Sequence, residues 1–306
     1  MLTGLPFRWM CRAAAGMVCV LLAAPADAQL LLKKESVYNS IFVYKEGPYR
    51  VLKFGHKRKH YRESIYNPSD PTELPAPYTQ YTTAGLAYAA KLERAATVGM
   101  GGGRITWYLT HYLSDLRATG VELDPEIVRI ADRYFDVRPT GRIDIATRDG
   151  RIFMRRTEET YDFIVVDAYR GHFVPFHLLT REFYELLERR LEPGGVVVQN
   201  IAPRTMLFDH ALATISAVFD TVDLYKARNN IVAIAHNGPR RSIEALVAAA
   251  EPLQARFGFR YSLPDMVRER LVTPEWDPEK VLTDDFAPAN YLKSVEAHNR
   301  KWKRER

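Results

Sequence analysis

Cysteine is almost absent from this chain of 306 residues, which contains only two. Both of them, Cys11 and Cys19, lie close to the N-terminus. A protein cleaved after residue 28 would contain no thiol, which excludes disulfide bonds, a cysteine nucleophile and a cysteine-based metal site. His111, His172 and His177 are scattered, and no pair of them has helical ligand spacing with carboxylate support. We therefore expect no bound metal.

The chain also lacks an apolar segment of the length that crosses a membrane. The apolar run at residues 13–24 is too short to span a bilayer as an ordinary helix. Arg8 and Arg12 precede this run, and the small-x-small sequence at residues 26–28 follows it. This layout predicts a signal peptide over residues 1–28 and an exported protein, periplasmic or secreted, without a stable membrane span. An uncleaved N-terminal anchor is the alternative.

A strong excess of one charge is missing too. The net charge is +6, and it falls to +5 without Arg8, Arg12 and Asp27 of the predicted leader. Part of this excess lies in a basic C-terminal tail, residues 293–306. Such a tail is more often a solvated end than a nucleic-acid patch, so we expect no nucleic-acid partner. A homodimer is compatible with the sequence.

Two regions follow the predicted leader. At residues 36–54, extended segments flank a Gly47-Pro48 turn, which predicts a β-hairpin. Residues 55–79 are polar and rich in proline, and they predict a long loop. We take residues 29–77 as a small N-terminal β domain with its loop, and residues 78–292 as the main domain.

Strands and helices alternate in the main domain. The expected helices are residues 78–92, 105–113, 125–135, 180–191, 206–219 and 240–256. The expected strands are residues 95–98, the segment ending at Glu122, and residues 143–146, 163–166, 195–201, 221–225 and 230–235. A tight turn joins the last two strands and implies an antiparallel pair at one sheet edge. The pattern predicts an α/β fold with a doubly wound sheet, whose ligands bind at the carboxyl ends of the strands.

Four glycines follow the first of these strands within five residues: Gly99, Gly101, Gly102 and Gly103. Glycine allows a sharp turn and a close approach of the backbone to a ligand. About twenty residues further on, Glu122 ends the next strand, where a carboxylate accepts hydrogen bonds from ribose hydroxyls. Loop, following helix and acidic residue together predict nucleoside binding.

Two more carboxylates follow later strands and should meet at the same edge of the sheet. Asp149 precedes Gly150, and a carboxylate there suits adenine because the N6 amino group is a donor. Asp167 follows the most apolar strand, where it would accept a proton or hold an amine. Alternatively, Asp149 only forms a turn with Gly150, and Asp167 only caps the next segment.

A series of ordered motifs now resembles the spermidine synthases and their bacterial relatives, the polyamine aminopropyltransferase family. The motifs are residues 98–103, 121–125, 149–150, 161–167, 179–184 and 282–288. Residues 35–41 resemble the small β domain of that family, so the resemblance covers residues 35–292.

This resemblance implies a class I methyltransferase-like Rossmann sheet after a small β domain. It implies transfer of an aminopropyl group from decarboxylated S-adenosylmethionine to putrescine. It assigns the nucleoside thioether to the glycines of residues 99–103, the ribose to Glu122 and the adenine to Asp149, next to Gly150. Asp167 would deprotonate the attacking amine. The acceptor site would contain Tyr78, and Tyr169 and Arg170 are expected to contact the substrate.

Two arginines depart from the family pattern. Arg104 and Arg170 stand where the family has aspartates that hold cationic groups. Reversing one such charge changes an interaction at about 4 Å by up to about 8 kcal/mol at an effective dielectric constant near 20. Arg104 would instead suit the carboxylate of intact S-adenosylmethionine. Methyl transfer and a non-catalytic exported ligand-binding module are therefore alternative functions. Alternatively, both arginines only turn to solvent.

Overall fold

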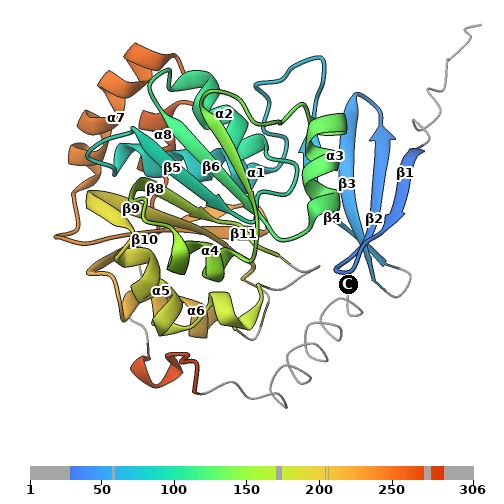
Figure 1. Ribbon diagram of the computed structural model, residues 1–306. Coiled ribbons are helices and arrows are strands. Elements are labelled where there is room, and N and C mark those ends of the chain that lie inside the picture. Colours follow the sequence, from blue (N-terminus) through green and yellow to red (C-terminus); the bar gives the residue numbers. More distant parts are fainter. Residues whose placement is uncertain are drawn as a thin grey trace, which may run out of the picture.

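The computed structural model describes residues 28–56, 59–169, 174–203, 205, 207–271 and 277–285. Nearly all of the predicted signal peptide, Arg170 and the basic tail lie outside these residues, so export stays a prediction. No described helix has both the length and the apolar character needed to cross a membrane. The described chain forms a small sheet beside a large one that is covered by helices on both faces (Figure 1).

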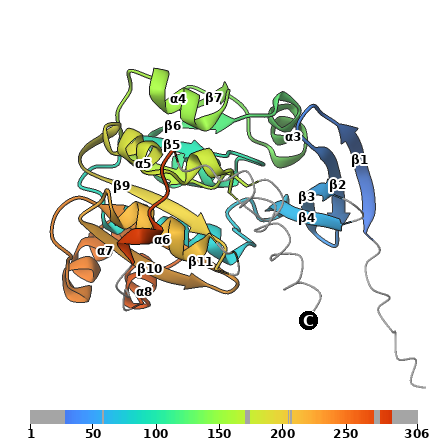
Figure 2. The same ribbon diagram turned by 90° about the horizontal axis from the view of Figure 1, so that it is seen from below.

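The small sheet is N-terminal and antiparallel. Its strands, in spatial order, are β1 (Gln29–Glu35), β2 (Ser40–Glu46), β3 (Tyr49–His56) and β4 (Lys59–Tyr66). The predicted hairpin is confirmed as β2 and β3, with Gly47 at a φ of +58° in the turn. Ile41, Val43 and Leu52 are buried, and they pack against helix α3 (Pro125–Phe135). This contact fixes the small sheet beside the carboxyl ends of the large one (Figure 2).

The long loop expected at residues 55–79 is wrong in part, because β4 occupies residues 59–66 and pairs with β3. The strand was missed because its pattern is not hydrophobic. Glu63 and Ser64, in the middle of β4, line a cavity, and Ser64 also contacts the glycine turn. A buried strand would normally have apolar residues at these positions.

The large sheet confirms the predicted doubly wound α/β fold. Its strands are β5 (Arg94–Val98), β6 (Arg117–Glu122), β7 (Ile143–Thr147), β8 (Tyr161–Val166), β9 (Leu191–Ile201), β10 (Thr221–Ala227) and β11 (Asn230–His236). The spatial order is β10-β11-β9-β8-β5-β6-β7, and the five strands from β9 to β7 are parallel. The predicted antiparallel pair is confirmed as β10 and β11. This is the class I methyltransferase-like Rossmann arrangement.

Helices cover both faces of this sheet and close two cores. One face carries η1 (Thr83–Ala87), α2 (Arg104–Tyr112), α7 (Ile243–Phe257) and α8 (Leu263–Arg268), and the other carries α4 (Gly150–Arg156), α5 (Arg181–Glu188) and α6 (Phe208–Ser216). The helix expected at residues 78–92 is shorter and divided into α1 (Pro77–Thr82) and η1. Gly85 lies against the sheet there, where a Cβ would meet Val198 Cγ2 at 2.6 Å.

A position can require glycine because its φ is positive or because a Cβ would clash, and three glycines of this chain distinguish these two reasons. Gly99 has a φ of +84°, and a Cβ there would meet the Ala168 backbone at 2.5 Å. Gly47 has a φ of +58° with open space around it, and Gly141 has open space and no positive φ. We predict that Gly141→Ala leaves the free energy of unfolding unchanged and that Gly47→Ala lowers it by about 1–2 kcal/mol. Gly99→Ala should lower it by more than about 3 kcal/mol.

Denaturant titrations of the three variants measure these differences. Equal losses for Gly47→Ala and Gly99→Ala would contradict the role of the backbone contact with Ala168.

Candidate functional site

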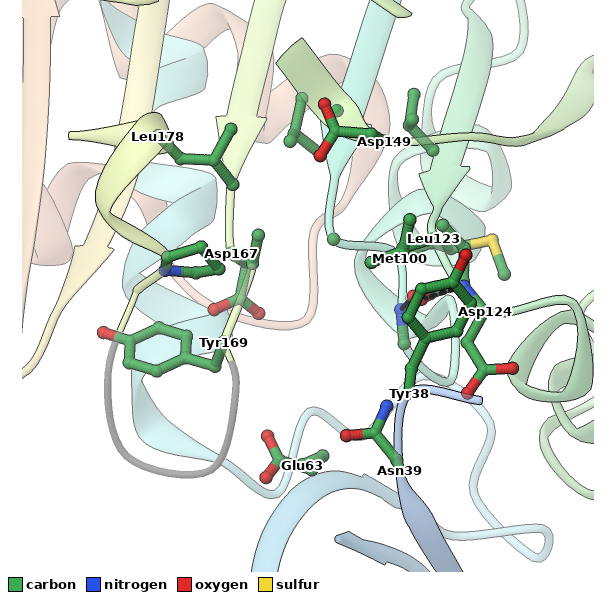
Figure 3. A pocket seen from close by; sticks show the side chains of 18 of the residues that line it. Tyr38, Asn39, Glu63, Met100, Leu123, Asp124, Asp149, Asp167, Tyr169 and Leu178 are labelled. Atoms are coloured by element: carbon green, nitrogen blue, oxygen red, sulfur yellow. Dashed lines mark hydrogen bonds between the residues drawn. The ribbon is translucent and has the colours of Figure 1, made fainter. Parts of the chain in front are cut away.

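A cavity of about 490 Å³ opens at the carboxyl ends of β5, β6 and β8. Figure 3 shows side chains from both sheets around it. The small sheet contributes Tyr38, Asn39, Phe54, Glu63 and Ser64. The large sheet and its loops contribute Gly99, Met100, Gly101, Glu122, Asp124, Asp149, Gly150, Asp167 and Tyr169, and the segment at residues 175–178 completes the wall. The volume is that of a small-molecule site.

The glycine turn after β5 forms part of this wall. Gly99 and Gly101 line the cavity, and the amide of Gly101 donates to Glu122 Oε2 at 2.9 Å. Gly102 and Gly103 do not line it, which corrects the expectation that they contact a ligand. The amide of Gly102 donates to Ser64 Oγ at 2.9 Å, and Gly103 lies against Val137 at the start of α2. These two glycines let the turn pack between β4 and α3.

Glu122 ends β6 with its carboxylate in the cavity wall. It accepts hydrogen bonds from the amides of Gly101 at 2.9 Å and Asp124 at 3.1 Å. Burial raises its pKa above the ordinary value, although these amides oppose the rise. The amides fix the position of a carboxylate that still has acceptor capacity toward the cavity.

Asp149 was expected either to accept from an adenine amino group or only to form a turn with Gly150. Its position is compatible with both roles. Its Oδ1 accepts from the amide of Ile152 at 2.9 Å and caps α4. Its Oδ2 lies 2.9 Å from Nε2 of His177, and this contact holds the pKa of Asp149 below its ordinary value. Asp149 and Gly150 also line the cavity. At Gly150 a Cβ would meet Val98 Cγ1 at 2.3 Å, so the start of α4 lies directly against β5.

Asp167 lies at the end of β8, where burial raises the pKa of its carboxyl group from 3.8 to about 7. Two hydrogen bonds oppose this rise, one from Nδ2 of Asn200 at 2.8 Å and one from the hydroxyl of Tyr78. Burial and the adjacent carboxylate also raise the pKa of Tyr78, which keeps its proton and acts as a donor. The structure thus brings together Asp167 and Tyr78, the two predicted catalytic residues.

Asn200 and Asn230 were missed by the sequence analysis. The Nδ2 group of Asn230 donates to Oδ1 of Asn200 at 2.7 Å, which directs the Asn200 amide group toward Asp167. The hydroxyl of Tyr169 donates to the Asn200 carbonyl at 3.0 Å. Asn200 stands near the carboxyl end of the parallel strand β9. Ligands of such a sheet bind at the carboxyl ends of its parallel strands, and this rule, which indicated Asp167 after β8, would have indicated Asn200 as well.

Arg104 does not face the cavity, which corrects its prediction as a ligand for a carboxylate. Its buried guanidinium donates to the carbonyls of Phe135, at 3.0 Å, and Pro71. The same group lies 4.3 Å from the ring centre of Tyr66 and 4.1 Å from that of Trp107. Burial lowers its pKa to about 10, so the group stays charged at neutral pH. Arg104 therefore joins α2 to α3 and to the loop after β4.

The comparisons with known proteins agree with this geometry. The spermine/spermidine synthase domain matches residues 81–228. The polyamine aminopropyltransferase of Vibrio vulnificus is 30% identical over an alignment of 294 residues that covers 90% of this chain and 96% of that protein. The chain belongs to the polyamine aminopropyltransferase family. It is accordingly a transferase, as the sequence predicted.

Solved structures of this family share the fold. A probable spermidine synthase from Corynebacterium glutamicum superposes with a TM-score of 0.62 and 21% identity, over 81% of this chain and 99% of that one. A spermidine synthase in complex with the transition state analogue AdoDATO gives a TM-score of 0.58 and 17% identity, over 87% of each chain. Within the described residues, no three His, Cys, Asp or Glu side chains come together as metal ligands would.

The position of Arg104 predicts a role in stability. We expect Arg104→Lys to lower the free energy of unfolding by about 2 kcal/mol, because one ammonium cannot reproduce both carbonyl contacts and both ring contacts. Arg104→Asp should cost about 3–5 kcal/mol, since it buries a carboxylate among carbonyl oxygens. The exposed Arg138 provides the control, and Arg138→Lys should change stability by less than about 0.5 kcal/mol. Denaturant titration checks all three, and an Arg104→Lys value equal to the control would refute the structural role.

Burial of Asp167 predicts that Asp167→Asn stabilises the protein at alkaline pH. A raised pKa means that folding favours the protonated form, so ionisation costs stability above pH 3.8 and reaches its full cost above about pH 7. Asparagine keeps an oxygen for the Asn200 amide and carries no charge. The gain over the unmodified protein should be absent at pH 4 and largest at pH 8, measured by denaturant titration across this range.

Asp149→Asn is the matched control with the opposite sign. The lowered pKa of Asp149 contributes stability at neutral pH that is lost as the pH falls through it. This variant should therefore be less stable than the unmodified protein at pH 8. The same sign for both variants would contradict the assigned environments.

Proposed function

We propose that the cavity binds an adenosyl thioether and that the protein transfers an aminopropyl group from decarboxylated S-adenosylmethionine to an amine acceptor. The observation that carries this proposal is the Asp167 carboxyl group, which is held by Tyr78 and Asn200 with a pKa of about 7 in the cavity wall. A general base is most effective when its pKa lies near the working pH.

The nucleoside would occupy the end of the cavity between β6 and α4. There Glu122 offers carboxylate oxygen to ribose hydroxyls, and Asp149 offers it to the amino group of adenine. Gly99 and Gly101 bring the backbone to the cavity wall without side chains. The donor's sulfur would then lie beside the glycine turn and Asp167, because β5 and β8 are neighbouring parallel strands whose carboxyl ends lie side by side.

The reaction is a displacement at carbon. The lone pair of the acceptor nitrogen attacks the aminopropyl carbon that is bound to the sulfonium, and the carbon–sulfur bond breaks with its electrons remaining on sulfur. The products are a secondary ammonium and the neutral thioether methylthioadenosine. Before the attack, Asp167 accepts the proton that the ammonium form of the acceptor must lose to free its lone pair, and Tyr78 donates a hydrogen bond that fixes the position of the carboxylate.

Methyl transfer loses its support from the sequence. It depended on Arg104 as the partner of the carboxylate that intact S-adenosylmethionine retains, and Arg104 contacts the carbonyls of Phe135 and Pro71 instead. A non-catalytic module would not require a buried carboxylate with a matched base pKa and two neutral hydrogen-bond donors. We therefore favour the aminopropyl reaction.

Calorimetry and a pH–rate profile test this function. We expect decarboxylated S-adenosylmethionine to bind more tightly than the intact form, and methylthioadenosine to be released when an amine is added. The rate should rise with pH through about 7, as Asp167 loses its proton. Asn200→Ala should move this rise to higher pH, because the Asn200 amide lowers the pKa of Asp167.

The exposed Asp115 supplies the control for the loss of a carboxylate. Asp167→Asn should reduce the rate by roughly 100-fold or more, and Asp115→Asn should leave it unchanged. The proposal fails if neither nucleoside binds at millimolar concentration.

A further inference from the structure

The carboxylates of the cavity divide into two groups. At the nucleoside end, Glu122, Asp124 and Asp149 each accept main-chain amides that fix their positions. At the opposite end lie Asp167 and one further carboxylate, that of Glu63 from β4. The proposed reaction gives Asp167 a task and leaves Glu63 without one.

Glu63 comes from the small sheet, yet it faces the reacting end of the cavity. Figure 3 shows its carboxylate turned into the hollow on the side of Asp167 and Tyr169. The charge of Glu63 raises the pKa of both Tyr78 and Tyr169, in addition to the larger effect of burial. The carboxylate is therefore close enough to act on the two hydroxyl groups that flank Asp167.

A cationic chain at this end of the cavity needs a lasting negative charge. Asp167 is poorly suited to supply it, because a carboxyl group with a pKa of about 7 is protonated half of the time at that pH, and the reaction adds a proton to it. The family's other two acidic positions are occupied by Arg104, which contacts backbone carbonyls outside the cavity, and by Arg170. Among the described residues, Glu63 is the remaining carboxylate that lines this end.

We propose that Glu63 is a substrate-binding residue whose carboxylate holds a primary ammonium group on an aliphatic chain, while Asp167 receives the proton of the reacting nitrogen. This inference rests on the proposed aminopropyl transfer. The ammonium has two sources, the aminopropyl group of the donor and the far end of a diamine acceptor. Both are ammonium groups on short alkyl chains, and they reach the hollow beside Asp167 in different complexes.

Binding measurements with three ligands test the proposal. Methylthioadenosine carries the nucleoside without an ammonium, decarboxylated S-adenosylmethionine adds the donor ammonium, and putrescine with saturating methylthioadenosine reports the acceptor. We expect Glu63→Gln to weaken one of the two cationic ligands by roughly 10- to 100-fold, the usual effect of losing a charged hydrogen-bond partner. Methylthioadenosine should bind within about 2-fold of the unmodified protein, because its contacts lie at the other end.

Two further variants separate charge from structure. Glu63→Asp keeps the charge and should restore part of the lost affinity. Glu35→Gln removes the same charge from an exposed position of the same small sheet, and it should leave all three affinities unchanged. In the transfer assay, Glu63→Gln should raise the KM of the ligand that it weakens and change kcat by less than about 3-fold, since binding energy of this kind is shared by ground and transition states.

The outcomes distinguish this inference from the proposed function. Unchanged affinity for both cationic ligands in Glu63→Gln overturns the role of Glu63, even where the unmodified protein transfers an aminopropyl group. If the protein binds no nucleoside, the proposed function fails, and putrescine alone then tests Glu63. A loss of putrescine binding in Glu63→Gln supports the ammonium site, and unchanged or absent binding of putrescine overturns it.

Discussion

The turn after β5 is the constraint on which the rest of the site depends. The amides of Gly99 and Met100 donate to the Val121 carbonyl of β6, at 2.9 and 3.0 Å, and the amide of Asp167 donates to the Val98 carbonyl of β5 at 2.8 Å. The ends of three parallel strands are thus held together by backbone alone. This is possible because Gly99 has no Cβ and lies against Ala168. This junction therefore sets the distance between the carboxylates of Glu122, at the end of β6, and Asp167, after β8.

The small sheet completes the cavity, and α3 and Arg104 keep it in place. Arg104 lies between the rings of Tyr66, on β4, and Trp107, on α2, and it donates to the loop and to the end of α3. The guanidinium of Arg104, which was expected to bind a ligand, therefore stabilises the contact between the two sheets. The same contact positions Glu63 at the cavity, so stability and charge placement are coupled through one buried side chain.

The sequence predicted what depends on local chemistry and on strand order. The hairpin around Gly47 and the parallel strands were readable because turn residues and apolar runs leave direct signals. Strand β4 was not, since its middle residues face a cavity rather than a core. The side-chain direction of Arg104 was not readable either, because it depends on carbonyl groups more than 30 residues away in the chain. Asn200 could have been found by the strand-end rule, but its contact with Asp167 required the knowledge that β9 lies beside β8.

The two carboxylates at the reacting end have environments that suit different tasks. Among the described residues, Asp167 receives two neutral donors and no cation, so burial dominates and its proton affinity rises to the range a base needs. A group tuned in this way cannot also be a constant counter-ion, because the charge it offers disappears when it accepts a proton. The proposed transfer of an aminopropyl group involves cationic chains, so it calls for a second carboxylate beside this base. The small sheet brings the Glu63 carboxylate to this end of the cavity, so closing the site and placing the proposed ammonium partner depend on the same strand, β4.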